Sequence, residues 1–166
     1  YSILSSHALP DQGGETEVAD MSAAYDDLPE DRKDEIENYI CVHSIFQSRA
    51  TIGFTDFTDE ERAALPPVPQ MLVRTHPGSG RKCLYLASHA EGIQGMAAPE
   101  AKMLLLDLME HATQRKYIYT HQWRTGDVLM WDNRCTMHAV TPFDNQTQRR
   151  IMHRTTIVGD EAPIAA

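Results

Sequence analysis

The stretch WDNRCTMHAVTPFDNQTQRRIMHRTT, residues 131–156, decides the fold class of this chain. Two β-strands are expected here, over 135–140 and 149–158, with polar turn residues between them. Strand residues that are two positions apart share a face, so Arg150 and Arg154 must point the same way. This shared direction makes the last strand the most informative part of the sequence.

The face that carries the two arginines could lie outside or inside the fold. Charged residues on a strand more often point to solvent, which is the simpler arrangement. If Arg150 and Arg154 point inward, they require anionic partners, because an unpaired buried charge is very costly. Arginine binds a carboxylate through two parallel hydrogen bonds. An inward pair would therefore indicate two carboxylate-bearing ligands, or one such ligand and an internal acid.

The remainder of the chain combines short strands with a few helices. Apolar residues at helical spacing between Leu104 and Ala112 predict a core-packing helix over 99–113. Shorter helices are expected over 20–28 and 29–39. Further strands are expected over 1–8, 15–19, 71–75, 83–88, 116–123 and 127–131. These elements predict a mainly β fold with helical insertions, and a jelly roll (double-stranded β-helix) is the best specific match.

Two parts of the chain resist assignment to regular elements. Segment 45–69 contains Gly53 and the run Pro66-Pro67-Val68-Pro69, which predicts a lid-like or irregular insertion. Residues 160–166 are expected to form a loose tail. Because the chain opens directly on a strand, we expect a fragment. Residues 1–159 would then be the C-terminal part of a single jelly-roll domain that is incomplete at its N-terminus.

Composition restricts the functional classes. The chain has 166 residues, 42% of them hydrophobic, which suits one domain with a real core. The net charge of −9 and the lack of a basic patch argue against nucleic acid as a partner. No apolar run is long enough to span a bilayer. The three cysteines are widely spaced and odd in number, which favours a reduced, cytoplasmic location.

Common catalytic motifs give no match. None of the eight histidines forms the helical pair of a zinc protease, and neither a Gly-x-Ser-x-Gly elbow nor a phosphate-binding glycine loop is present. His138 shares a strand face with Thr136 and Val140. A lone histidine on a strand is more often structural than a metal ligand. Its meaning therefore depends on its neighbours.

Those neighbours carry a family resemblance. The pattern Trp131-Asp132-Asn133-Arg134-x-Thr136-x-His138, followed by Arg150-x-x-x-Arg154, resembles the C-terminal signature of the TauD/TfdA family of Fe(II)/2-oxoglutarate-dependent dioxygenases. Gly13-Gly14-Glu15-Thr16 is similar to the family's Gly-Gly-x-Thr segment, and 74–90 is similar to its middle strands. The match covers nearly the whole chain and is nearest to the 2,4-dichlorophenoxyacetate branch.

The resemblance implies a site with Fe(II), 2-oxoglutarate as cosubstrate, and O₂. It implies that His138 is an iron ligand and that Arg150 and Thr16 bind the distal carboxylate of 2-oxoglutarate, with Trp131 beside them. Arg154 is implied to bind an anionic substrate, and His89 is a further candidate for substrate contact. Iron in this family is held by two histidines and one carboxylate. The other two ligands come from a His-x-Asp motif, which this sequence lacks.

The implied reaction is hydroxylation of a small anionic substrate. The first expectation is an aryloxyalkanoate such as 2,4-dichlorophenoxyacetate, giving a phenol, glyoxylate, succinate and CO₂. The alternatives are a taurine or alkylsulfonate dioxygenase of the same family, or a non-catalytic jelly-roll domain that binds a small acid or a partner. With one iron ligand of three, the 166-residue chain alone is expected to be inactive. The full-length protein is expected to be a homo-oligomer.

Overall fold

The structure is a computed structural model and describes residues 1–159. The predicted loose tail over 160–166 lies outside the described residues. In chain order the elements are β1 (Ser2–Ala8), β2 (Thr16–Asp20), α1 (Met21–Asp26), α2 (Glu30–Ile36), β3 (Ile40–His43), α3 (Ile45–Ala50), α4 (Asp59–Ala64), β4 (Val68–Met71), β5 (Val73–Thr75), β6 (Lys82–Leu84), β7 (Ala90–Ile93), α5 (Ala98–Ala112), the 3₁₀ helix η1 (Arg115–Tyr117), β8 (Ile118–His121), β9 (Val128–Trp131), β10 (Thr136–Val140) and β11 (Ile151–Thr156).

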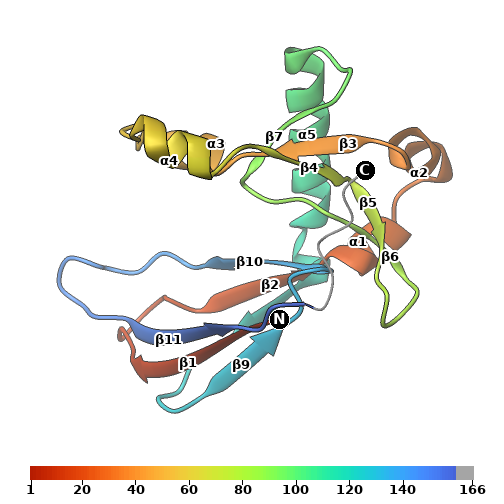
Figure 1. Cartoon of the computed structure of the whole chain (residues 1–166). Coiled ribbons are helices and arrows are strands. Elements are labelled where there is room, and N and C mark those ends of the chain that lie inside the picture. The colour runs from red at the N-terminus through yellow and green to blue at the C-terminus, as the bar shows by residue number, and fades with distance from the viewer. Residues whose placement is uncertain (160–166) are drawn as a thin grey trace.

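Two antiparallel sheets make up one half of the molecule. One has the strand order β11-β1-β9 and the other the order β10-β2-β8. Figure 1 shows them as two layers, with β10 and β2 lying over β11, β1 and β9. Strands that are far apart in sequence are neighbours in both sheets, as in a jelly roll. The prediction of a mainly β fold with helical insertions is confirmed.

Strand register decides which side chains face the space between the two sheets. Trp131 of β9 and Arg154 of β11 share one face of the first sheet, because they pair with Ser2 and Leu4, two positions apart on β1. In the second sheet, Thr16 and His138 share a face, since His138 pairs with Val18. The rings of Trp131 and His138 approach to 4.8 Å between centroids, so these two faces are the ones that oppose each other.

The hydrophobic core lies on the other side of the second sheet. Its outer face contributes Ala19, Met137 and Ile118, which pack with α1, α5 and the strands β3, β5, β6 and β7. The helix predicted over 99–113 is confirmed as α5, and its apolar stripe is buried. Its buried residues are Ala101, Leu104, Leu105, Leu108 and Ala112.

Local hydrogen bonds explain where the first helix begins. The side chain of Asp20 accepts hydrogen bonds from the backbone N–H groups of Ser22 at 2.9 Å and Ala23 at 3.0 Å. These bonds satisfy two N–H groups that have no partner within the helix. The helix predicted over 20–28 is confirmed as α1, with Asp20 as its N-cap.

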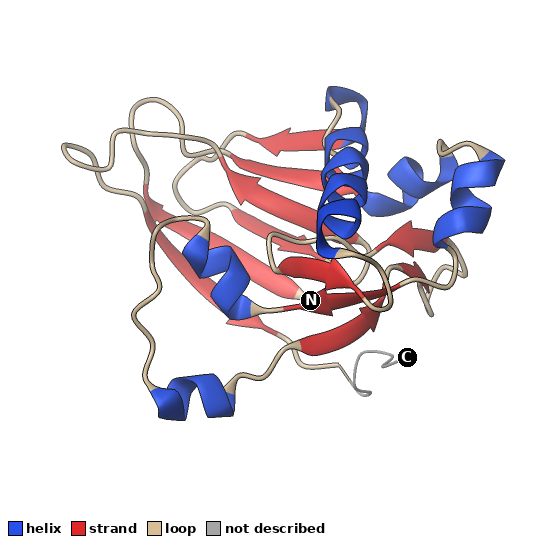
Figure 2. Ribbon diagram, turned by 90° about the horizontal axis from the view of Figure 1, so that it is seen from above, coloured by secondary structure: helices blue, strands red, loops and turns tan. Residues whose placement is uncertain are grey.

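The expectation that 45–69 resists regular structure is wrong in part. The segment contains α3, α4 and the start of β4, and Figure 2 shows the two short helices projecting from the strands at one corner of the molecule. Helix α4 begins with a capping box, in which Thr58 and Glu61 exchange side-chain and backbone hydrogen bonds. A lid function for this segment stays a prediction.

Other boundaries also differ from the predictions. The strand expected over 83–88 ends at Leu84, and the last strand begins at Ile151 instead of Arg149. The short strands β3 and β7 were not predicted, because each has four residues and no clear alternation. Among residues 1–159, no helix combines the length and the apolar character needed to cross a membrane.

Shortening a core side chain of α5 tests this packing. Leu108 is 1% exposed, so Leu108→Ala should lower the free energy of unfolding by about 2–5 kcal/mol through lost burial and a residual cavity. Met103 lies on the same helix but is 73% exposed, so Met103→Ala should change the free energy of unfolding by less than about 0.5 kcal/mol. Urea unfolding of both variants measures the difference. Equal losses would contradict the placement of the core.

Candidate functional site

A hydrogen-bonded pair of polar side chains, one buried and one half-buried, connects the two sheets. Arg150, immediately before β11, donates from Nε to the carbonyl oxygen of Gly14 at 2.8 Å and from Nη2 to Oγ1 of Thr16 at 3.2 Å. Thr16 begins β2 and is 3% exposed. Burial lowers the pKa of Arg150, which keeps its charge. Arg150 therefore points into the space between the sheets and not to solvent.

Thr16 has a further partner that sequence reasoning missed. The indole Nε1 of Trp123 donates to Oγ1 of Thr16 at 3.0 Å. Trp123 lies two residues beyond His121, which pairs directly with Thr16, and the two rings meet edge-on at 4.4 Å. Alternation along 119–123 could have placed Trp123 on this face, but nothing in the sequence gave the register of β8 against β2.

A second group of side chains also lies between the two sheets. Trp131 is 7% exposed, and its indole Nε1 donates to Oδ1 of Asn133 at 2.9 Å, while its ring packs against His138. Partial burial lowers the pKa of His138, and the nearby charge of Arg154 lowers it further. At neutral pH His138 is thus an uncharged imidazole, the form that can bind a metal ion. Arg154 itself remains exposed on the same face.

His89 lies in a different environment. Its Nδ1 is 2.8 Å from Oγ of Ser48 on α3, and its carbonyl oxygen accepts a hydrogen bond from the N–H of Ser44. Burial, followed by the charges of Arg74 and His89, lowers the pKa of the neighbouring His43 to about 4. The structure thus groups His89 with β3 and α3. No hydrogen bond among residues 1–159 links it to His138.

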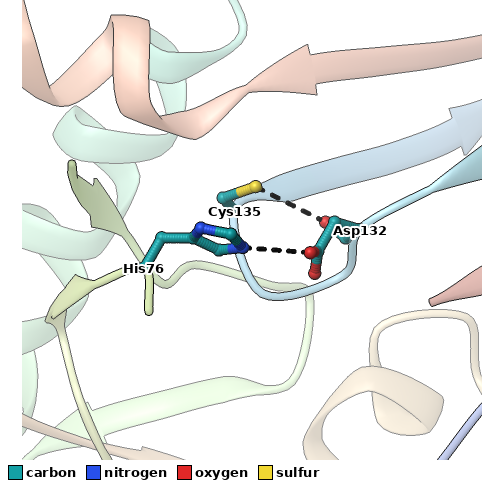
Figure 3. Close-up of side chains that lie close together, drawn as sticks. All are labelled: His76, Asp132 and Cys135. Atoms are coloured by element: carbon teal, nitrogen blue, oxygen red, sulfur yellow. Dashed lines mark hydrogen bonds and ion pairs between the residues drawn. The ribbon is translucent and has the colours of Figure 1, made fainter. Parts of the chain in front are cut away.

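One cluster in the described chain has donor atoms close enough together to suggest a metal site. It consists of His76, Asp132 and Cys135 (Figure 3). His76 Nε2 lies 3.0 Å from Oδ2 of Asp132. However, Arg134 already occupies both carboxylate oxygens, with Nη2 at 2.6 Å from Oδ2 and Nε at 2.9 Å from Oδ1. A metal ion would have to displace this cation, so the cluster fits a structural role better.

This cluster holds the turn that leads into β10. Asp132 accepts hydrogen bonds from His76, from Arg134 and from the backbone N–H of Arg134, and its carbonyl oxygen accepts from the hydroxyl of Thr136 at 2.7 Å. These contacts fix the turn between Trp131 and His138. The described chain therefore supplies His138 as a candidate iron ligand but does not supply a complete iron site with it.

Removing the Asp132 carboxylate tests the turn. The pKa of Asp132 is lowered well below its usual range, mainly by Arg134. A lowered folded-state pKa adds stability that is present above the unfolded pKa of about 3.9 and is lost as the pH falls toward the folded value. Asp132→Asn should therefore unfold more easily than the native chain at pH 7, and the difference should shrink below about pH 4. Urea unfolding from pH 7 to 3 measures it.

Asp56→Asn is the matched control for this experiment. Asp56 is exposed, and no ion pair of it occurs within residues 1–159, so its loss should change stability little at any pH in this range. A stability difference between native and Asp132→Asn chains that stays constant from pH 7 to 3 would contradict the ionic role of Asp132.

Gly14 fits closely against the arginine of the site. Its φ is +75°, and a Cβ built there would lie 3.1 Å from Cδ of Arg150 and 2.9 Å from Cγ of Pro10. Gly95 has a similar φ of +78° but has no atom within 4 Å of such a Cβ. Alanine is strained by about 1–2 kcal/mol in either backbone. The two glycines therefore separate backbone strain from contact with the side chains of Pro10 and Arg150.

Gly14→Ala should destabilise the chain by at least about 1 kcal/mol more than Gly95→Ala, because the added methyl group meets the side chains of both Pro10 and Arg150. Urea unfolding of the two variants measures this difference. If both lose the same amount, backbone strain alone explains the effect, and the close packing of Gly14 against Pro10 and Arg150 contributes nothing.

The family follows from comparison with known proteins. The family model described as "Taurine catabolism dioxygenase TauD, TfdA family" matches residues 1–156. The chain is 48% identical to an alpha-ketoglutarate-dependent 2,4-dichlorophenoxyacetate dioxygenase of Burkholderia sp. (strain RASC), over 96% of the chain and 53% of that protein. It is 42% identical to an (S)-phenoxypropionate/alpha-ketoglutarate-dioxygenase of Sphingobium herbicidovorans, over 96% of the chain and 58% of that protein.

A solved structure agrees in fold. The crystal structure of AAD-2 in complex with Mn(II) and N-oxalylglycine superposes with a TM-score of 0.93 at 50% identity, covering 98% of this chain and 64% of that one. The chain spans about half the length of the curated relatives that it matches. These matches confirm the predicted jelly roll. The chain belongs to the TauD/TfdA family of dioxygenases.

Proposed function

We propose that this chain is the part of an Fe(II)/2-oxoglutarate-dependent dioxygenase that binds 2-oxoglutarate, faces the substrate and supplies one iron ligand. The observation that carries the proposal is the hydrogen bond between half-buried Arg150 and buried Thr16, placed between the sheets on the side that also holds His138. Two relatives named above depend on alpha-ketoglutarate, and the solved structure holds a metal with N-oxalylglycine.

The residues present suit the distal carboxylate of 2-oxoglutarate. Arg150 has five N–H groups, of which two are used by Gly14 and Thr16, so donors remain for a carboxylate. Partial burial strengthens a charge-assisted hydrogen bond there. With iron bound, 2-oxoglutarate would supply two of the four electrons that reduce O₂, becoming succinate and CO₂, and the hydroxylated substrate would supply the other two. Trp131, which is 7% exposed and packs against His138, is proposed to keep water from this side of the site.

Iron does not fit the described residues taken alone. His138 offers an uncharged imidazole, but one ligand does not hold Fe(II), and this family uses three. We therefore assign His138 as one iron ligand and derive no step through the metal. The remaining ligands would come from outside residues 1–159, which agrees with the share of each relative that the chain covers.

Arg154 is the proposed substrate contact. Its exposed side chain lies on the face of the first sheet that looks toward His138, and its charge lowers the pKa of His138. A substrate held by Arg154 would therefore lie near the proposed metal ligand. A guanidinium pairs well with a carboxylate. Together with the relatives, this favours an aryloxyalkanoate such as 2,4-dichlorophenoxyacetate, which hydroxylation beside the ether oxygen converts to a phenol and glyoxylate. His89 is proposed as a second substrate contact.

An alkylsulfonate is the second candidate substrate, because guanidinium also binds sulfonate, but the curated relatives named above favour carboxylates. The cytoplasmic location and the homo-oligomeric state stay predictions, as does the assignment of residues 1–159 to one domain. Substrate-dependent formation of succinate by the iron-loaded full-length protein, measured with aryloxyalkanoates and with taurine, distinguishes the candidates and also tests the non-catalytic alternative.

Replacing each of the two arginines in turn tests its role. In the iron-loaded full-length protein, Arg150→Gln should raise the KM for 2-oxoglutarate about tenfold or more and should leave the KM for the aryloxyalkanoate nearly unchanged. Arg154→Ala should raise the KM for the aryloxyalkanoate and leave the KM for 2-oxoglutarate nearly unchanged. Steady-state kinetics with each substrate varied in turn measure both constants. Arg149→Gln, at the exposed neighbouring position, is the control and should change neither. Equal effects of Arg154→Ala on both KM values would refute its assignment.

A further inference from the structure

The hydroxyl group of Thr16 receives two hydrogen bonds. Nε1 of Trp123 donates to its Oγ1 at 3.0 Å, and Nη2 of Arg150 donates to the same atom at 3.2 Å. Neither an indole nor a guanidinium can accept a hydrogen bond at these nitrogens. Both partners are therefore obligate donors, and Thr16 is the acceptor in both contacts.

This pattern determines the direction of the Thr16 proton. A hydroxyl group has two acceptor lone pairs and one O–H donor. The two N–H donors use both lone pairs, so the O–H must point away from Trp123 and Arg150. No acceptor for it occurs among residues 1–159, although Thr16 is only 3% exposed. A buried donor without an acceptor is unfavourable, which makes this hydroxyl a site that requires an incoming acceptor.

We propose that Trp123 is a positioning residue that makes the Thr16 hydroxyl a dedicated donor, so that the site selects a carboxylate over a neutral amide. The inference rests on the proposed binding of 2-oxoglutarate at Arg150 and Thr16. Every polar group that faces the ligand is then a donor: the free N–H groups of Arg150 and the O–H of Thr16. A carboxylate accepts through both oxygens. The terminal amide of 2-oxoglutaramate would direct an NH₂ group against donors.

Neighbouring residues hold the indole in place. The Trp123 ring meets the His121 ring edge-on at 4.4 Å. His121 in turn has Nδ1 at 3.2 Å from the hydroxyl of Tyr119 and Nε2 at 3.3 Å from Oδ2 of Asp127. Since His121 pairs with Thr16 in the sheet, this arrangement keeps the indole N–H directed at the Thr16 oxygen. Phenylalanine at 123 would keep the ring contact and remove only the N–H.

Direct binding tests the proposal without turnover. The metal-free full-length protein is titrated with 2-oxoglutarate while the ¹H–¹⁵N indole resonances are followed, with the resonance of Trp131 as the reporter that all variants retain. Trp123→Phe should weaken 2-oxoglutarate binding about five- to tenfold, which is less than the loss of a whole hydrogen bond to a charged group, because the Thr16 hydroxyl remains and loses only its fixed direction. In a Thr16→Val background, which lacks the hydroxyl, the same change should have less than a twofold effect. Thr16→Ser should restore the full effect of Trp123→Phe.

A second titration tests selectivity. The native chain should bind 2-oxoglutarate at least tenfold more tightly than 2-oxoglutaramate, and Trp123→Phe should reduce this preference, because the hydroxyl is then free to rotate and accept. An unchanged affinity in Trp123→Phe, or an equal loss with and without the Thr16 hydroxyl, would overturn the role of Trp123 alone. Native full-length protein that binds no 2-oxoglutarate, with or without iron, would instead overturn the proposed function.

Discussion

The contact between Arg150 and Thr16 is the interaction on which the site depends. It links the residue before β11, in one sheet, to the first residue of β2, in the other, and it places a cation between the two sheets. Burial of a guanidinium is costly, and two hydrogen bonds, to Gly14 and Thr16, offset part of that cost. The N–H groups that remain are already oriented before any ligand arrives. Such preorganised donors bind an anion without having to reorder first.

Strand periodicity predicted the more regular part of this arrangement. Two-residue alternation placed Arg154 on one face of the last strand, and the sequence motifs singled out Thr16, Trp131 and His138. Trp123 could not be found in this way, because its contact with Thr16 depends on the register of β8 against β2. Register between strands that are a hundred residues apart is set by tertiary packing, which local pattern does not contain.

The fold shows the same division between local and long-range information. Helix α5 was predictable because its apolar stripe repeats over fifteen residues, and α1 because Asp20 caps it. Strands β3 and β7 were missed because they are short and gain their stability from each other and from β4. Within 45–69, proline and glycine suggested irregular structure, whereas the capping box of Thr58 and Glu61 is enough to begin a short helix.

The two histidine environments near β10 show why proximity of donor atoms does not identify a metal site. His76, Asp132 and Cys135 lie close together, but Arg134 already neutralises the carboxylate, so a divalent ion gains little by replacing it. His138 has no such partner within residues 1–159, yet its pKa is lowered, which keeps its lone pair available. Unused binding capacity, at His138 for a metal and at Thr16 for a carboxylate, is therefore the better indicator of function in this chain. Both groups face the same space between the sheets, so one ligand that bridges them would use both.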